Sequence, residues 1–143
     1  MRIIGFSFQK ISAERKKDIQ GKLEIKSNLQ IEDIEKETID IAGEILKFHY
    51  IYSINYEPGF GEITFKGSVL VAPEKEDIKH IFKEWKKKKL DENTRLFVFN
   101  FIISKCNLKA LQLEEEFALP PHIPLPRFSK QQTQQPDKAN YAG

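Results

Sequence analysis

The sequence predicts an α+β fold, a four-stranded antiparallel sheet packed on one face by two C-terminal helices. Four segments with strand character occupy the first half of the chain, and after Pro73 the hydrophobic period changes from two to 3.6 residues. Strands that are segregated from helices in this way form layered α+β domains. The period change therefore places the sheet before both helices.

The first two expected strands cover residues 2–13 and 20–29. Isoleucine and phenylalanine alternate with polar residues in the first strand until Ile11 falls out of phase, which indicates a bulge or an end near Gln9. Residues 30–42 mix both periods. A short helical turn and an extended connection are both compatible with that segment.

The third and fourth expected strands, residues 44–56 and 62–71, form a long hairpin. Large apolar side chains occupy every even position from 46 to 56. Pro58 and Gly59 supply the turn, because proline presets φ at the second turn position and glycine accepts a positive φ at the third.

Two helices are expected next, at residues 74–88 and 92–118. An apolar stripe at helical spacing marks the first, with acidic residues at its start and lysines at its end, as the helix dipole favours. Asp91 is positioned as the N-cap of the second helix. The first half of this long helix is apolar nearly all round, which predicts burial on several sides.

An unbroken heptad seam runs along the long helix and requires an apolar partner surface. The partner is either the chain's own sheet or another subunit. The seam consists of Leu96, Phe99, Ile103, Cys106, Ala110, Leu113 and Phe117. Glu114, Glu115 and Glu116 are expected on its wet side.

A proline-rich segment, Leu119-Pro120-Pro121-His122-Ile123-Pro124-Leu125-Pro126-Arg127, ends the helix. Its apolar residues between prolines favour a strap across the chain's own sheet over a polyproline ligand for another protein. Residues 129–143 are polar and aperiodic, so we expect a disordered tail after a single domain of residues 1–128.

The composition describes a soluble globular protein with 40% hydrophobic and 31% charged residues. The single cysteine excludes an internal disulfide, and we expect a cytoplasmic location, with neither a signal peptide nor membrane insertion. The net charge of +2 gives no global field for nucleic acid. Abundant Lys, Glu and Ile are compatible with a thermophilic source.

Neither a metal nor another cofactor is expected, because no convergent ligand set appears. Glu76, His80 and Glu84 lie four residues apart on the first helix, but a third or fourth ligand from elsewhere is not evident. A solvated helix face with pairs to lysines is the favoured interpretation.

No catalytic residue is expected either, so the prediction is a non-enzymatic protein. Cys106 lies on the apolar seam and reads as a buried structural thiol. His49 and His122 lack an evident orienting acid.

The run Lys86 to Lys89 closes the first helix. A solvated helix end that matches the dipole is favoured there. The alternative is a small nucleic-acid-associated protein that uses these lysines with Trp85 as a stacking residue.

The aromatic side chains are the strongest functional signal. They fill a core and an oligomer interface, or they form a groove for apolar segments of non-native polypeptides. We assign polypeptide binding to the aromatic residues of the hairpin, namely Phe48, Tyr50, Tyr52, Tyr56, Phe60 and Phe65.

The order of elements resembles the SecB-like export chaperones over about residues 2–127. The resemblance lies in the opening strand from Ile3 to Ile11, the strand at 22–26, the hairpin at 46–71, and the long helix with its proline-rich end. It implies four antiparallel strands, a long helix packed in an oligomer, and chaperone-like binding of unfolded or exported polypeptides. The net charge departs from that family's acidic translocase-contacting surface. The phrase Leu-Pro-Pro-x-Ile-Pro-Leu-Pro-Arg also resembles the ending of small archaeal proteins without assigned activity.

Overall fold

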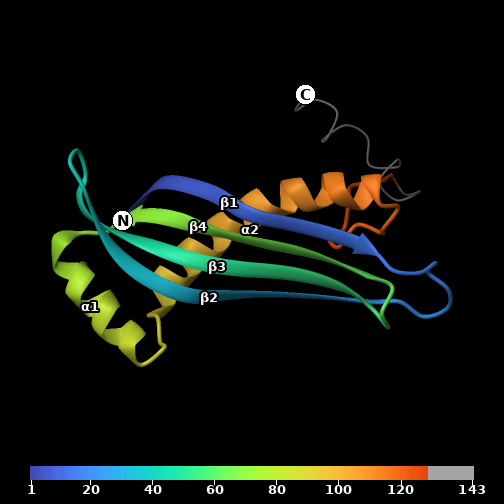
Figure 1. Cartoon of the computed structure of the whole chain (residues 1–143), viewed down its shortest axis with the longest axis horizontal. Helices are drawn as coiled ribbons and strands as arrows, with labels where there is room; N and C mark the ends of the chain where they lie inside the picture. Colours follow the sequence, from blue (N-terminus) through green and yellow to red (C-terminus); the bar gives the residue numbers. More distant parts are fainter. Residues whose placement is uncertain (129–143) are drawn as a thin grey trace.

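The computed structural model describes residues 1–128 and shows one antiparallel sheet with two helices. The elements are β1 (Arg2–Arg15), β2 (Glu24–Ile39), β3 (Gly43–Glu57), β4 (Gly61–Ala72), α1 (Lys75–Lys86) and α2 (Glu92–Glu116). The strand order is β1-β4-β3-β2, with α2 running behind the sheet and α1 at one end (Figure 1). The predicted fold class is confirmed. The tail predicted at residues 129–143 lies outside the described residues.

The central hairpin has the predicted position. β3 and β4 pair from Leu46 opposite Val71 to Tyr56 opposite Gly61. Gly59 adopts the expected positive φ of 65°, and the Glu57–Pro58 peptide bond is cis. This turn joins the two strands of the sheet that contain the most buried residues.

Both outer strands are longer than the sequence indicates, because bulges interrupt their alternation. The register of β1 against β4 shifts between Phe8 and Lys10, which confirms the bulge near Gln9, and the strand then continues to Arg15. The register of β2 against β3 shifts between Ile31 and Asp33. One extra residue reverses the inward phase of β2. The apolar residues of segment 30–39 therefore follow two different periods, although the whole segment is strand. Of the two alternatives for this segment, the extended chain is the correct one.

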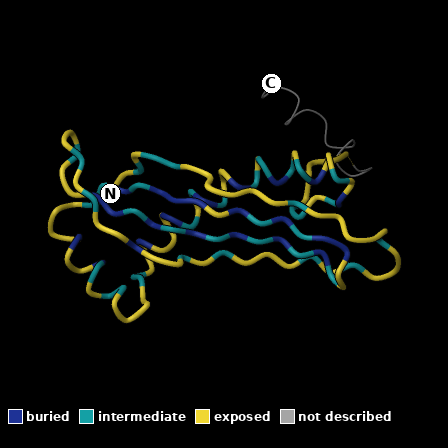
Figure 2. The backbone as a smooth tube through the Cα atoms, viewed as in Figure 1, coloured by how far each residue is buried: buried dark blue, intermediate teal, exposed yellow. Residues whose placement is uncertain are grey.

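The core lies between α2 and one face of the sheet. The even-numbered side chains of β3 from Leu46 to Tyr56 all point into it, and Figure 2 shows this buried band along the middle strands. The other face carries mainly polar side chains, such as Lys47, Ser53 and Asn55 on β3, each partly exposed. Only one sheet face is therefore covered by helix.

The residues of α2 that face the sheet repeat every four positions and not in heptads. The buried row is Thr94, Val98, Ile102, Cys106, Ala110 and Glu114. A row with this spacing winds about 40° around the helix for each step. A twisted sheet can follow such a row, whereas a straight partner helix favours the 3.5-residue period. Of the predicted seam, only Cys106 and Ala110 belong to the buried row; Phe99, Ile103, Leu113 and Phe117 flank it.

The first half of α2 is not covered on several sides, contrary to expectation. Leu96 is 45% exposed and Phe97 is 38% exposed, although both lie in the most apolar stretch. By length and composition, α2 is the one helix among residues 1–128 that is apolar enough to cross a membrane. In the structure its buried row packs on the sheet, and Leu96 and Phe97 remain partly open to solvent.

Asp91 caps α2 as predicted. Its side chain accepts hydrogen bonds from the Thr94 amide, at 3.0 Å, and from the Thr94 hydroxyl, at 2.7 Å. Burial acts to raise the pKa of the Asp91 carboxyl, but these hydrogen bonds outweigh it and lower the pKa.

We expect Asp91→Ala to cost about 1 kcal/mol of unfolding free energy at neutral pH. Because the folded-state pKa is depressed, the ionised cap stabilises above the unfolded pKa, and its contribution is lost as pH falls through the folded value. Urea denaturation of both proteins at neutral pH and at about pH 3 tests this. A difference that stays the same at both pH values would contradict the ionised cap.

Candidate functional site

Apolar side chains are exposed along β1 and α2, which lie side by side. Phe6 of β1 packs edge-on against Phe101 of α2, with ring centroids 5.8 Å apart. The large apolar residues exposed on the two elements are Ile4, Phe8 and Ile11 on β1, at 36–38%, and Leu96, Phe97 and Leu108 on α2, at 38–69%. We call these six residues the apolar belt. Its three β1 residues lie on an edge strand of the sheet, so unpaired backbone groups adjoin them.

The aromatic residues to which sequence analysis assigned polypeptide binding lie in the core instead. All six side chains are between 0% and 4% exposed: Phe48, Tyr50, Tyr52, Tyr56, Phe60 and Phe65. Their assignment to binding stays a prediction. The belt supplies apolar surface that a partner can reach. Its residues on β1 were not predicted as binding residues, because they alternate along the strand in the same way as core residues.

A groove of about 500 Å³ lies along β2. Four consecutive β2 residues line it, from Leu29 to Glu32, where the strand bulges. Trp85 and Leu90 come from the end of α1 and the α1–α2 connection, and Phe99 comes from α2. Leu29, Ile31, Trp85 and Leu90 pack against the core without being fully buried.

Two cations stand over the aromatic lining of this groove. Lys88 Nζ lies 4.7 Å from the ring centroid of Trp85, and the Arg95 guanidinium lies 5.8 Å from that of Phe99. Lys88 has a left-handed φ of 58°, which turns the chain at the end of α1. Within residues 1–128 neither cation has a carboxylate within 4.0 Å. The groove thus combines apolar surface with unneutralised positive charge.

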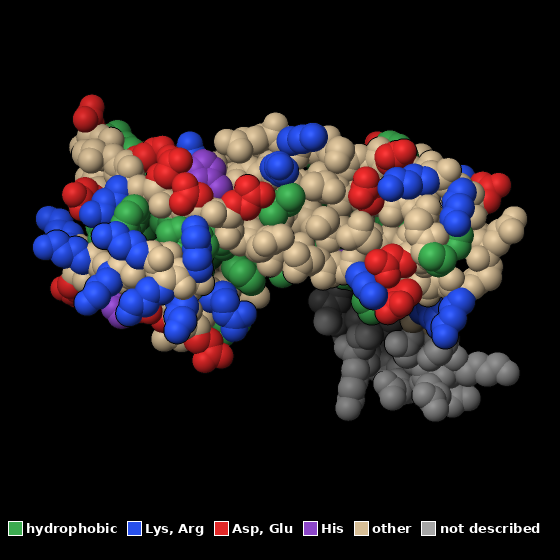
Figure 3. Space-filling model, turned by 60° about the horizontal axis from the view of Figure 1, so that its bottom comes forward, with side chains coloured by type: hydrophobic (Ala, Val, Ile, Leu, Met, Phe, Trp, Pro, Cys, Tyr) green, Lys and Arg blue, Asp and Glu red, His purple; other side chains and the backbone are tan. Residues whose placement is uncertain are grey.

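The lysine run is exposed at the end of the molecule that carries α1. Lys86, Lys87, Lys88 and Lys89 are all exposed, and Figure 3 shows basic side chains gathered over this end. The indole of Trp85 donates to Asp33, with Nε1 and Oδ1 3.5 Å apart, while Lys88 covers its ring. A nucleic-acid base that stacks on Trp85 must therefore displace Lys88.

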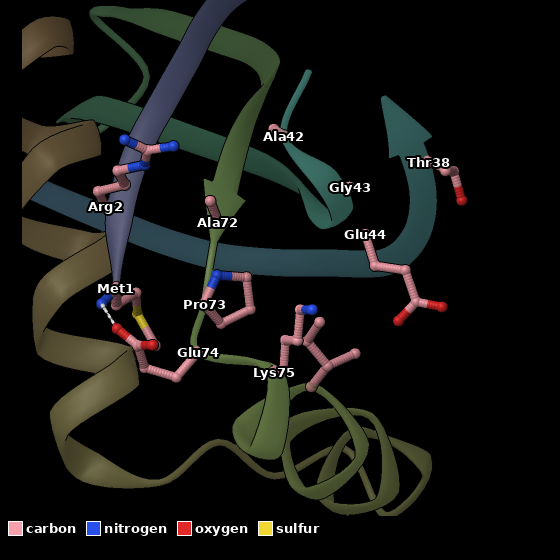
Figure 4. Close-up of a pocket in the computed structure, with 11 residues that line it drawn as sticks. Met1, Arg2, Thr38, Ala42, Gly43, Glu44, Ala72, Pro73, Glu74 and Lys75 are labelled. Carbon is pink, nitrogen blue, oxygen red and sulfur yellow. Dashed lines mark ion pairs between the residues drawn. The ribbon is translucent and has the colours of Figure 1, made fainter. Parts of the chain in front are cut away.

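A wider cleft of about 950 Å³ lies between the β2–β3 turn and the start of α1 (Figure 4). Its lining carries both positive and negative side chains. Arg2 and Lys75 face it together with Glu44 and Glu74, and Glu74 lies 3.8 Å from the amino group of Met1. Since the charges largely cancel and no set of them converges, this cleft shows no chemistry of its own.

A buried polar cluster forms where α2 meets the proline-rich segment, and it corrects two expectations. Glu114 is 1% exposed and therefore does not lie on the wet side of α2. His122 does have an orienting acid, because its Nδ1 lies 2.9 Å from Glu114 Oε2. The His122 Nε2 lies 2.7 Å from Asn107 Oδ1, so both ring nitrogens have a polar partner.

Tyr56 completes this cluster. Its hydroxyl donates to Glu114 and is 2.8 Å from the carbonyl oxygen of Pro120. Burial, followed by the hydrogen bond to Glu114, raises the pKa of Tyr56, so the phenol remains a donor at neutral pH. A carboxylate held by a phenol and an imidazole is satisfied inside the core.

The proline-rich segment is a strap over its own sheet as far as His122. Leu119 is 4% exposed, and its side chain lies against Gly61 at the start of β4. Beyond His122 the cover ends, since Leu125 is 52% exposed and Phe128 is 85% exposed. The strap therefore closes one end of the core and leaves apolar side chains free after it.

The remaining candidate residues, Cys106, His49 and the Glu76–His80–Glu84 set, show no arrangement for catalysis or metal binding within residues 1–128. Cys106 is fully buried, as expected, and burial raises its thiol pKa to about 12, which keeps it protonated. His49 Nε2 lies 3.3 Å from Glu35, an acid that sequence analysis did not identify, but the two do not share a hydrogen bond. In the described part of the chain, Glu76, His80 and Glu84 do not form a metal-binding group.

Comparison with known proteins finds a structural relative and no relative by sequence. No family model matches the chain, and no curated protein matches it. The fold is similar to that of the SecB-like chaperone Rv1957 of Mycobacterium tuberculosis, solved in complex with a ChAD peptide from the HigA1 antitoxin Rv1956. The TM-score is 0.53 at 13% identity, covering 90% of this chain and 91% of that one. The chain thus has the fold of the SecB-like chaperones.

Proposed function

We propose that this protein is a non-enzymatic, oligomeric chaperone that binds apolar segments of non-native polypeptides. The observation that carries the proposal is the apolar belt. Six large apolar side chains are more than a third exposed on two elements that contact each other, and exposed apolar patches mark interaction sites. The fold similarity to a chaperone solved with a peptide supports the same function.

Two kinds of partner can use this surface. A second copy of the chain buries part of the belt and pairs with the free edge of β1. A client segment gains about 25 cal/mol for each Å² of apolar area that it buries. Extended clients also form backbone hydrogen bonds with a free strand edge.

We expect the purified protein to suppress the aggregation of a thermally unfolding client at a stoichiometric ratio. Replacing Phe97 and Leu108 by serine should reduce that suppression several-fold, because both side chains are exposed and neither supports the core. Light scattering should show an oligomer for the parent chain. The matched control is Asn100→Ser and Gln112→Ser on the same helix, which leaves the belt intact.

Normal client aggregation at a stoichiometric ratio would contradict chaperone activity. A monomeric mass together with full suppression of client aggregation would contradict the proposed oligomer but not the proposed client binding. Unchanged suppression by the serine variant would assign client binding to a surface other than the belt.

Binding of nucleic acid by Lys86 to Lys89 is the second candidate, and the exposure of these lysines favours it. It predicts a mobility shift of single-stranded DNA that weakens steeply with salt. The absence of any shift at low salt would exclude it.

A further inference from the structure

We propose that the groove along β2 binds extended polypeptide segments that carry aspartate or glutamate beside an apolar residue. The proposal rests on the proposed chaperone function and gives that function a charge preference. Lys88 and Arg95 supply the preference, and the apolar floor of the groove supplies the affinity.

The shape of the groove suits an extended segment. β2 is the outermost strand of the sheet, so one side of its backbone has no partner strand. A segment laid along that edge places alternate side chains over the groove. The floor offers Leu29 and Ile31 from the strand and two aromatic rings from the helices. An apolar client side chain enters here without any rearrangement of the core.

Charge decides which segments bind best. The lining contains two cations, Lys88 and Arg95, against one carboxylate, Glu32, which leaves a formal charge of two minus one, or +1. Both cations sit over aromatic rings, where they lie close to any segment on the floor. An acidic client side chain at the rim gains two charge-assisted contacts, whereas a basic one meets repulsion.

The single tryptophan of the chain makes this site directly observable. Trp85 lines the groove, so a bound segment changes its fluorescence, and a segment bound at the β1 edge, on the opposite border of the sheet, does not contact it. We would titrate the full chain with three short extended peptides. They share an alternating apolar pattern and differ only in carrying glutamate, glutamine or lysine at the flanking positions.

The glutamate peptide should bind about fivefold more tightly than the glutamine peptide at low salt, since two partly exposed ion pairs form. The lysine peptide should bind most weakly, and high salt should bring the three affinities together. The double variant Lys88→Gln and Arg95→Gln should abolish the preference while the glutamine peptide still binds. The matched control Lys87→Gln removes one lysine of the same run outside the groove and should retain the preference.

The outcomes separate this proposal from the chaperone function. Equal affinities for the three peptides, or a preference that survives the double variant, would overturn the charge preference while client protection remains. Unchanged Trp85 fluorescence together with full suppression of client aggregation would show that the groove does not bind clients, and would leave the belt as the binding surface. Tighter binding of single-stranded DNA than of the glutamate peptide would assign the groove to nucleic acid.

Discussion

Glu114→Ala should lower the unfolding free energy by about 3 kcal/mol, because it leaves several buried donors without their acceptor. The substitution removes the acceptor of the Tyr56 hydroxyl and of both the His122 ring and the His122 amide. These donors would remain in a region where the Glu114 side chain is 1% exposed. The measurement is the urea midpoint at constant m-value.

Glu115→Ala is the matched control for this prediction. Glu115 is the next residue of the same helix and is exposed, so the change should stay within about 0.5 kcal/mol. Equal losses for Glu114→Ala and Glu115→Ala would mean that the buried cluster contributes nothing to stability. Glu114→Ala, unlike the control, should also release the proline-rich strap from α2, which we would detect as faster proteolysis after residue 119.

Gly67→Ala should cost about 3 kcal/mol or more, because the added methyl group has no space. A Cβ at this position would overlap the backbone carbonyl oxygen of Ser7 and come within 2.7 Å of the Tyr50 hydroxyl. Relief requires β1 to move away from β4, and β1 carries half of the apolar belt. We therefore expect a loss of client protection together with the loss of stability.

Gly5→Ala on β1 is the control for this second prediction. Its Cβ would meet only the flexible end of Leu70, at 3.0 Å, so the cost should remain below about 1 kcal/mol. Thermal unfolding of the two variants should differ by several degrees. A Gly67→Ala protein as stable as Gly5→Ala would show that β1 separates from the sheet at little cost.

The sequence predicts the layers of this fold well because its periods report burial directly. The even positions of β3 and the stripe of α1 needed no knowledge of partners. The α2 row was harder to predict, because an apolar residue occurs at almost every position near Val98 and the sheet's twist selects which of them are covered. A bulge likewise concealed the second half of β2.

The buried polar cluster around Glu114 could not be predicted from the sequence, for a different reason. Glu114 belongs to a run of three glutamates, and composition alone places all three in water. Its burial depends on a histidine eight residues later and on Tyr56 from another layer of the molecule. The groove depends in the same way on separate parts of the chain, because its β2 residues lie more than 50 positions before Trp85.

The strand order has a consequence for synthesis of the chain. β1 and β2 are neighbours in sequence but occupy opposite borders of the sheet, and Ser7 meets Ser68 only across 61 residues. As the polypeptide leaves the ribosome, β1 emerges first and waits for β4, while β2, β3 and β4 join through local turns. We expect the last three strands to assemble first and the N-terminal strand to dock afterwards. A nascent molecule of this protein therefore exposes an unpaired apolar strand of the kind that we propose the finished molecule binds.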